Sequence, residues 1–189
     1  ESLITDPSFE TRSLSSRWGS NSSSTLSTEN FYDARDGSKY LEVSGVNGSS
    51  GAYYEMATYT KGATTYSLQT GRSYYIGMWV GVANTNTQKA TLKVERKNLA
   101  GNYYQDFSTS LSFKGAGNNS GAIEWNYISG VYSFNDDEGS LDVSSPENVK
   151  LSIALDNTAV FFVDQVELYE IRPDSIFTST LIPLSDSSF

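Results

Sequence analysis

The sequence predicts an all-β protein, and within that class a β-sandwich. Apolar and polar residues alternate with a period of two over several segments, and turn-forming dipeptides such as Asp36-Gly37 separate these segments. No window of about 12 residues combines a 3.6-residue apolar period with helix caps. Several strands that each have one solvated face favour two sheets packed face to face.

The strands follow from the alternation, segment by segment. Residues 89–97 alternate most clearly and place three apolar side chains on one face: Ala90, Leu92 and Val94. The same pattern predicts five further strands, which lie at 39–43, 73–83, 124–134, 148–156 and 160–171. Weaker patterns add four candidate strands, at 3–5, 52–56, 103–107 and 111–113.

Composition excludes several function classes. The 189 residues include no Cys and no His, which excludes thiolate nucleophiles, His-ligated zinc and any catalytic triad that uses imidazole. The formal net charge of −9 argues against binding to nucleic acid or to an anionic membrane, because such binding depends on basic side chains. The length corresponds to one domain that can bury a core without disulfides.

Four sequence blocks stand in a distinctive order. They are Leu3–Glu10 followed by Trp18, then Gly71–Val80, Trp125–Tyr132 and Phe162–Leu168. This series resembles the jelly-roll carbohydrate-binding modules of families four, nine, sixteen and twenty-two. The resemblance covers residues 3–171 and implies a jelly roll of two antiparallel sheets at 1–171, followed by an ordered extension at 172–189. It departs from the pattern at 58–70, which has no counterpart, and at Gln165, where a second Asp is common.

Asp164 is the first candidate metal ligand. Alternation places its carboxylate on the apolar, inward face of the last predicted strand, and an unpaired buried charge is very costly. The resembled modules hold a structural calcium between an N-terminal Glu and this Asp, which implies Glu10 and Asp164 as ligands, with Asp6 as an addition. Calcium binds carboxylate and carbonyl oxygens, and here it would pin the N-terminal strand to the last strand. Alternatively, Asp164 caps a strand end or pairs with Arg12 or Lys39.

The predicted strand at 73–83 carries Tyr75 and Trp79 on the face opposite its apolar side, with Gly77 between them. The C–H face of a sugar ring packs on such flat rings, while its hydroxyl groups need polar side chains. We therefore expect Trp79 and Tyr75 to stack against a glycan in a groove on this sheet. The alternative places Trp79 under a loop or in the second layer of the sandwich.

Neighbouring strands supply further candidate ligand contacts. In the two adjacent tyrosine pairs, one member of each pair must face outward on a strand, and polar groups nearby would orient a sugar. The additional residues predicted in this way are Tyr53, Tyr54, Tyr103, Tyr104, Arg96 and Glu124. Trp125, by contrast, is assigned to the core.

These observations predict a non-catalytic carbohydrate-binding module that belongs to a secreted carbohydrate-active enzyme. The acidic net charge favours a neutral β-glycan as the ligand over a polyanion. We expect an extracellular monomer tethered to a catalytic domain, without nucleic-acid or membrane partners. Two alternatives are a structural or adhesive domain of a cell-surface or appendage protein, and a glycoside hydrolase or polysaccharide lyase of jelly-roll fold.

Overall fold

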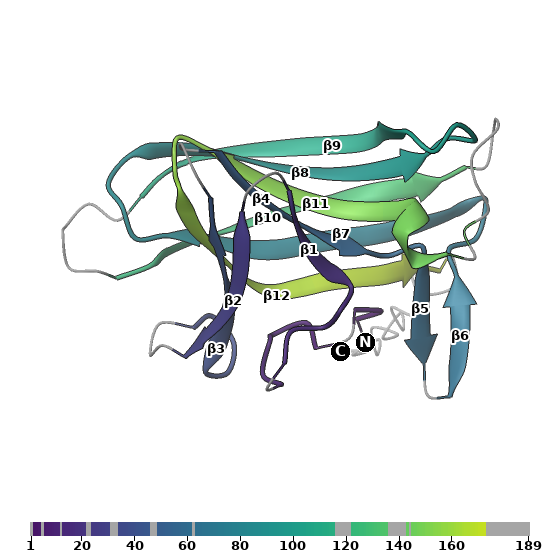
Figure 1. Ribbon diagram of the computed structural model, residues 1–189, viewed down its shortest axis with the longest axis horizontal. Helices are drawn as coiled ribbons and strands as arrows, with labels where there is room; N and C mark the ends of the chain where they lie inside the picture. Colours follow the sequence, from purple (N-terminus) through teal and green to yellow (C-terminus); the bar gives the residue numbers. More distant parts are fainter. Residues whose placement is uncertain are drawn as a thin grey trace, which may run out of the picture.

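Two five-stranded sheets and one short hairpin make up the fold (Figure 1). The structure is a computed structural model that describes residues 2–4, 6–11, 13–21, 24–30, 34–45, 49–61, 63–115, 122–135, 143 and 145–172. Sheet A contains, in spatial order, β1 (Trp18–Asn21), β4 (Ser49–Glu55), β11 (Val149–Asp156), β8 (Thr87–Lys97) and β9 (Tyr103–Lys114). Sheet B contains β10 (Glu124–Phe134), β7 (Arg72–Val82), β12 (Val160–Ile171), β3 (Lys39–Ser44) and β2 (Thr25–Asn30). The hairpin pairs β5 (Thr58–Lys61) with β6 (Thr64–Ser67), and a single 3-10 turn, η1 (Pro146–Asn148), precedes β11.

The prediction of an all-β jelly-roll sandwich is confirmed. Every strand pair in the two sheets is antiparallel. The six strongly patterned segments each coincide closely with a strand, and the two weak segments at 103–107 and 111–113 merge into β9. The weak prediction at 3–5 was wrong, because Leu3 and Ile4 lie outside any strand; the Leu3 amide nevertheless donates to the Leu168 carbonyl at 2.7 Å.

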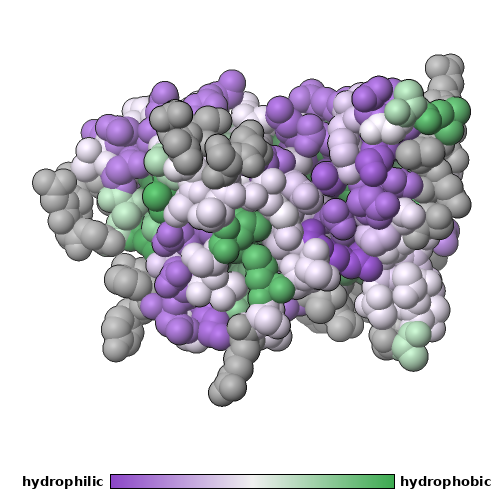
Figure 2. Space-filling view, viewed as in Figure 1, coloured by the Kyte–Doolittle hydropathy of each residue, from purple (hydrophilic) through white to green (hydrophobic). Residues whose placement is uncertain are grey.

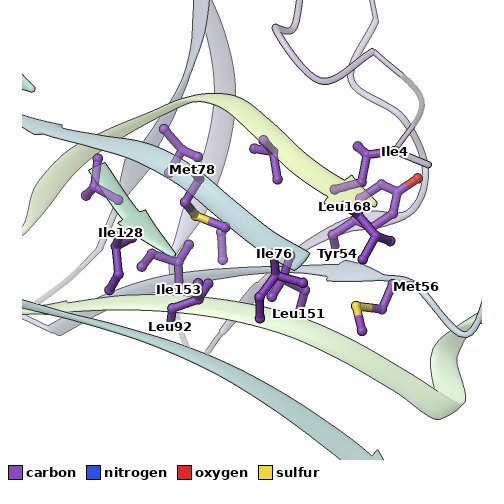
Figure 3. Close-up of a cluster of buried hydrophobic side chains, with 14 of the residues drawn as sticks. Ile4, Tyr54, Met56, Ile76, Met78, Leu92, Ile128, Leu151, Ile153 and Leu168 are labelled. Atoms are coloured by element: carbon purple, nitrogen blue, oxygen red, sulfur yellow. The ribbon is translucent and has the colours of Figure 1, made fainter. Parts of the chain in front are cut away.

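The core lies between the two sheets, where their inward faces meet (Figure 3). From β7, Ile76 and Met78 are fully buried, and opposite them Leu92, Leu151 and Ile153 of sheet A are no more than 1% exposed. These positions are the apolar phase of the alternation, so the period of two decides which side chains leave water. On the face displayed in Figure 2, hydrophobic residues form small separate groups within a mostly hydrophilic or pale surface.

A β-bulge in β12 changes which side chains face the core. The pairing of β12 with β7 shifts register between Asp164 and Glu167, and Gln165 in the bulge has a φ of +47°. Before the bulge, Phe161 and Val163 face inward, so the assignment of Phe162 and Asp164 to the inward face was wrong. After the bulge, Val166 and Leu168 face inward as predicted. One extra residue in a strand reverses the alternation, and the sequence carries no plain mark of it.

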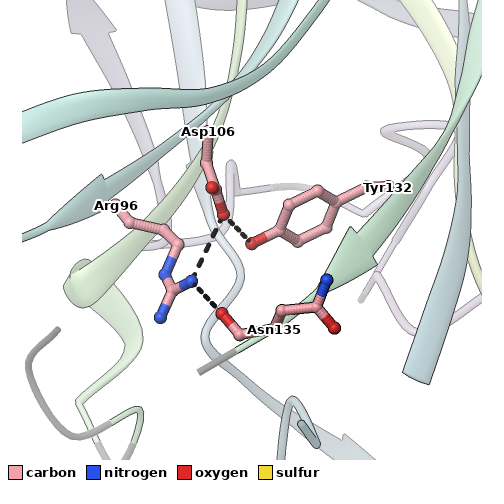
Figure 4. Close-up of polar contacts among 4 residues, drawn as sticks. All are labelled: Arg96, Asp106, Tyr132 and Asn135. Carbon is pink, nitrogen blue, oxygen red and sulfur yellow. Dashed lines mark hydrogen bonds and ion pairs between the residues drawn. The ribbon is translucent and has the colours of Figure 1, made fainter. Parts of the chain in front are cut away.

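Arg96 does not lie on the surface, although it was predicted to contact a ligand (Figure 4). Its side chain is only 4% exposed, and Nη1 donates to the Asn135 carbonyl at 2.7 Å and lies 3.4 Å from Asp106 Oδ2. The same Asp106 oxygen accepts a hydrogen bond from the Tyr132 hydroxyl at 2.6 Å. Burial, together with this carboxylate, raises the pKa of the Tyr132 phenol. Arg96 therefore links β8 to β9 and to the end of β10, and the Asp106 carboxylate balances its charge within the protein.

Replacing Arg96 with Met is expected to lower the free energy of unfolding by about 2–3 kcal/mol. The change leaves the Asn135 carbonyl without this donor and Asp106 without its cation, although Asp106 is partly hydrated. Urea denaturation measures the effect. Arg72→Met is the matched control, because its ion pair with Glu170 is exposed and is worth less than about 1 kcal/mol. Equal losses in the two variants would contradict a structural role for the buried cluster.

No helix among the described residues is long and apolar enough to cross a lipid bilayer. From residue 173 onward, the predicted C-terminal extension lies outside the described residues.

Candidate functional site

Aromatic and acidic side chains gather on the side of sheet B that is turned away from sheet A. Cross-strand pairing brings Tyr127 opposite Trp79, Tyr169 opposite Tyr75, and Glu167 opposite Gly77, so these side chains share one face. We call this surface the outer face of sheet B, and it comprises Tyr75, Trp79, Trp125, Tyr127, Glu167 and Tyr169. All six are half-buried, whereas Ile76 and Met78, which alternate with them along β7, point into the core.

Trp79 and Tyr75 therefore face outward, as the alternation of β7 predicts. Trp125 shares this face because it pairs with Gly81, so its assignment to the core was wrong. A Cβ atom on Gly81 would come 2.8 Å from the Trp125 ring, which explains why glycine is needed beside the indole. The residues that separate the aromatic rings along β7 are thus glycines because the rings of β10 lie over them.

A network of hydroxyl groups surrounds the carboxylate of Glu167. Tyr127 donates to Glu167 Oε2, and its hydroxyl lies 2.9 Å from the Tyr75 hydroxyl. The Tyr169 hydroxyl lies 3.4 Å from the other carboxylate oxygen, and the rings of Tyr75 and Tyr169 stack at 6.4 Å. Burial and the bond to Glu167 raise the pKa of Tyr127, so this phenol is a protonated donor at neutral pH. The face thus presents one carboxylate whose orientation is set by tyrosines.

The Trp79 indole is covered on one side by an arginine. The guanidinium carbon of Arg35 lies 4.0 Å from the centroid of the Trp79 ring, while the Tyr127 ring approaches at 5.2 Å and an interplanar angle of 55°. Arg35 itself is exposed to solvent. Trp79 thus combines the two possibilities considered from the sequence, because its ring faces outward and also lies against a loop residue. A ligand must share this ring with Arg35 or displace it.

Asp164 holds the loop that carries Arg35. It lies opposite Trp79 and is 0% exposed; its Oδ2 accepts hydrogen bonds from the amides of Arg35 and Asp36, at 2.7 and 2.9 Å. Its Oδ1 accepts from the Gln165 amide at 2.7 Å, within the bulge. Burial raises the pKa of Asp164 to about 6, and the three amide hydrogen bonds act in the opposite direction. The bulge therefore turns Asp164 outward, where its carboxylate fixes the backbone at 35–36.

Glu10 holds the other end of the same loop. Its Oε1 accepts from the amides of Ser38 and Lys39, at 2.8 and 2.7 Å, and its Oε2 accepts from the Ser38 hydroxyl at 3.0 Å. Although burial alone acts to raise it, these hydrogen bonds lower the pKa of Glu10. Asp6 accepts from the amides of Glu10 and Thr11 and so orders the N-terminal turn.

The oxygens at this loop are of the type that calcium binds, since Glu10 and Asp164 both direct carboxylate oxygens at the backbone of 35–39. The fully buried Asp164 carboxylate also fits a cation, because no ion pair among the described residues involves it. On the other hand, both carboxylates already accept amide hydrogen bonds, and the Lys39 ammonium donates to the carbonyls of Glu10 and Thr11. The described residues hold no cluster of three or more acidic metal-ligand side chains. Calcium at Glu10, Asp164 and Asp6 therefore stays a prediction.

The remaining candidate contacts lie elsewhere. Tyr53 and Tyr103 are on the outer side of sheet A, where the Lys150 ammonium lies 3.8 and 4.4 Å from their ring centroids. Tyr54 is 2% exposed and packs against Trp18 at 5.3 Å, so the prediction of a ligand contact conflicts with its burial. Two candidates are exposed away from the outer face of sheet B: Tyr104 on β9 and Glu124 at the start of β10. The sequence thus predicted residues on two opposite surfaces.

Five residues of the site escaped prediction as ligand contacts: Arg35, Trp125, Tyr127, Glu167 and Tyr169. Tyr127 could have been found, because it alternates with Trp125 along one predicted strand. Glu167 and Tyr169 alternate with the inward-facing Val166 and Leu168, so the pattern gave their outward direction but not their position beside Tyr75. Arg35 lies in a loop, where no periodic pattern singles it out.

Comparison with known proteins gives a likeness at the level of structure. No protein-family model matches the sequence, and no curated protein matches it. Among solved structures, the CBM22-1–GH10 modules of the endo-1,4-β-D-xylanase 10B of Clostridium thermocellum, in complex with xylohexaose, match with a TM-score of 0.67 at 19% identity. That match covers 91% of this chain and 29% of the xylanase chain.

Two other solved structures show the range of proteins with this architecture. The CBM22-1 xylan-binding domain of Paenibacillus barcinonensis Xyn10C matches with a TM-score of 0.61 at 17% identity, over 91% of this chain and 96% of that one. The enzymatically active domain of bacteriophage CBA120 tailspike protein 4 matches with a TM-score of 0.54 at 14% identity, over 90% and 21%. At these identities the likeness establishes the fold, and the chain has the jelly-roll fold of the family 22 carbohydrate-binding modules.

Proposed function

We propose that this chain is a non-catalytic carbohydrate-binding module that binds a polysaccharide on the outer face of sheet B. The observation that carries the proposal is the grouping of Trp79, Tyr75 and Tyr127 around the Glu167 carboxylate. Flat rings accept the C–H face of a sugar, and a carboxylate accepts hydrogen bonds from its hydroxyl groups. The fold shared with xylan-binding modules supports the same interpretation.

The hydroxyl network prepares this face for a polar ligand. Because tyrosines already orient Glu167, a sugar does not have to immobilise the carboxylate when it binds, which reduces the entropic cost of association. Preorganised carboxylate oxygens favour neighbouring hydroxyl donors, such as those on one edge of a pyranose ring. We expect modest affinity, roughly 10–100 μM, as in the recognition of a few sugar units.

The proposed setting is a secreted carbohydrate-active enzyme in which this chain is a monomer tethered to a catalytic domain. The match to the xylanase supports this setting, because it covers 29% of a chain that also contains a GH10 module. The tailspike match equally permits a domain of an appendage protein, so glycan binding has to be measured directly.

Affinity electrophoresis through gels that contain single soluble polysaccharides tests the proposal. The panel comprises xylan, glucomannan, mixed-linkage β-glucan, galactan and uncharged soluble cellulose derivatives, with albumin as the non-binding reference. We expect retardation by at least one glycan and no fall in its viscosity. A mobility relative to albumin that is the same with and without each glycan would exclude the binding function and favour a structural domain. A fall in the viscosity of a glycan would reveal an enzyme.

We also propose that Glu10 and Asp164 hold a structural calcium ion, with Asp6 contributing from the N-terminal turn. The support is that Glu10 and Asp164 both bind the loop at 35–39, so an ion there would tie β12, this loop and the N-terminal segment together. Its role is mechanical, since it would supply positive charge beside a buried carboxylate and would take no part in chemistry.

Removal of calcium with a chelator is expected to lower the melting temperature by about 5–10 °C, relative to a sample with calcium at 100 times its Kd. Differential scanning calorimetry measures the shift. Glu10→Gln is the comparison variant, since a weakened site should reduce the calcium-dependent shift. A melting temperature that is the same with calcium and with chelator would contradict the metal site and leave the hydrogen bonds as the whole connection.

A further inference from the structure

Arg35 is the unusual residue of the outer face of sheet B. Its guanidinium stacks on the Trp79 ring at 4.0 Å while the side chain as a whole remains exposed. Among the described residues, ion pairs involve Arg72, Arg96 and Arg172, and none involves Arg35. The neighbouring Asp36 carboxylate accepts from the Ser8 hydroxyl at 2.6 Å. Among the described residues, Arg35 is therefore a cation with no carboxylate partner, which is notable because the chain has 22 acidic and 13 basic residues.

The position of Arg35 is built into the fold. Its amide donates to the buried Asp164 carboxylate at 2.7 Å, and the next amide donates to the same oxygen. At the far end of the loop, Glu10 accepts from the amides of Ser38 and Lys39. The backbone beside Trp79 is therefore held from two sides, and this places the guanidinium over the indole before any ligand binds.

Stacking determines which part of the guanidinium a ligand can reach. When its flat face lies on the indole, the N–H donors at its edge remain available in the guanidinium plane. A carboxylate matches this edge, because its two oxygens accept two parallel hydrogen bonds. A neutral hydroxyl group makes a weaker bond there, since it carries no charge. The geometry thus favours a planar anion beside Trp79.

We propose that the preferred ligand is a polysaccharide that carries uronic acid units, with the uronate carboxylate bound by Arg35 beside the Trp79 ring. This inference rests on the proposed glycan-binding function and replaces the expectation of a wholly neutral glycan. It concerns isolated acidic units on a neutral chain, because Glu167 lies on the same face and the net charge of −9 repels a densely charged polymer.

A matched pair of polymers tests the proposal by isothermal titration calorimetry. One is glucuronoxylan, and the other is the same preparation after its uronic acid carboxyl groups have been reduced to alcohols. We expect the unmutated protein to bind the acidic polymer about tenfold more tightly than the reduced polymer. A lightly sulfated sample of the reduced polymer forms a third arm, and there we expect weaker binding than to the uronate.

Three variants locate the effect. Arg35→Met should bring the ratio of the affinities for the acidic and the reduced polymer close to one. Arg35→Lys should retain little of the preference for the acidic polymer, because an ammonium lacks the planar fork of donors. Lys93→Met removes the same charge from β8 on the opposite sheet and should leave the ratio unchanged. The Arg35 amide remains in each variant, so its bonds to Asp164 persist, and thermal melting confirms that the fold is retained.

The outcomes separate this inference from the proposed function. Equal binding of the acidic and reduced polymers, or binding only to neutral glycans of the panel, would overturn the uronate assignment and leave glycan binding intact. Equal binding of sulfated and uronate polymers would overturn the preference for a carboxylate. Failure to bind any polysaccharide would overturn both proposals.

Discussion

Replacing Asp164 with Ala is expected to lower the free energy of unfolding by about 3–5 kcal/mol. The change deprives three backbone amides of their acceptor, those of Arg35, Asp36 and Gln165, and the carboxylate that it removes is 0% exposed. Each unsatisfied buried donor costs about 1–3 kcal/mol, and water that enters the vacated space recovers part of that cost. Urea denaturation at neutral pH gives the value directly.

Two comparison variants sharpen this experiment. Asp164→Asn retains the shape and one acceptor oxygen but turns an amide group toward N–H donors, so we expect an intermediate loss. Asp36→Ala removes an exposed carboxylate from the same loop and should cost less than about 1 kcal/mol. A loss below 1 kcal/mol for Asp164→Ala, measured both with calcium and with chelator, would show that the loop at 35–39 does not depend on this carboxylate.

The second large effect is expected for Trp79→Ala, which should weaken glycan binding about 30-fold. Trp79 lies in the middle of the outer face of sheet B, in contact with Tyr127 and Arg35, and partly buried aromatic residues of this kind dominate binding energies. The loss corresponds to roughly 2 kcal/mol. Calorimetric titration with the best glycan of the panel measures it, and a melting curve checks that the variant is folded.

The controls for Trp79 distinguish the two faces of the sandwich. Tyr66→Ala removes an exposed ring from the β5–β6 hairpin and should not change affinity. Tyr53→Ala tests the opposite sheet, since this side chain was predicted to contact a ligand and lies on the outer side of sheet A with Lys150. A large loss for Tyr53→Ala and none for Trp79→Ala would place the binding surface on sheet A.

The sequence predicted well those features that depend on neighbours along one strand. Alternation of apolar and polar residues identified the long strands and placed Ile76 and Met78 in the core, because successive side chains of a strand point to opposite faces. The same rule turned Tyr75 and Trp79 outward. Applied equally to Trp125 and Tyr127, it would have extended the site to β10.

Prediction failed where contacts between distant residues decide the structure. The bulge at Gln165 reversed the assignment of Phe162 and Asp164. Arg96 continues the inward phase of Ala90, Leu92 and Val94, so alternation indicated its direction, but the groups that balance its charge come from β9 and from the end of β10. The link between Asp164 and the loop spans 129 residues, and no local pattern encodes such a distance.

Local alternation by itself determined the two-layered sandwich and the outward direction of Trp79, because the side-chain period of a strand requires no information from the rest of the chain. Tertiary structure alone decided what covers that ring. It placed Arg35 over the indole through a bulge that turned Asp164 toward the loop, where the buried carboxylate accepts hydrogen bonds from two backbone amides.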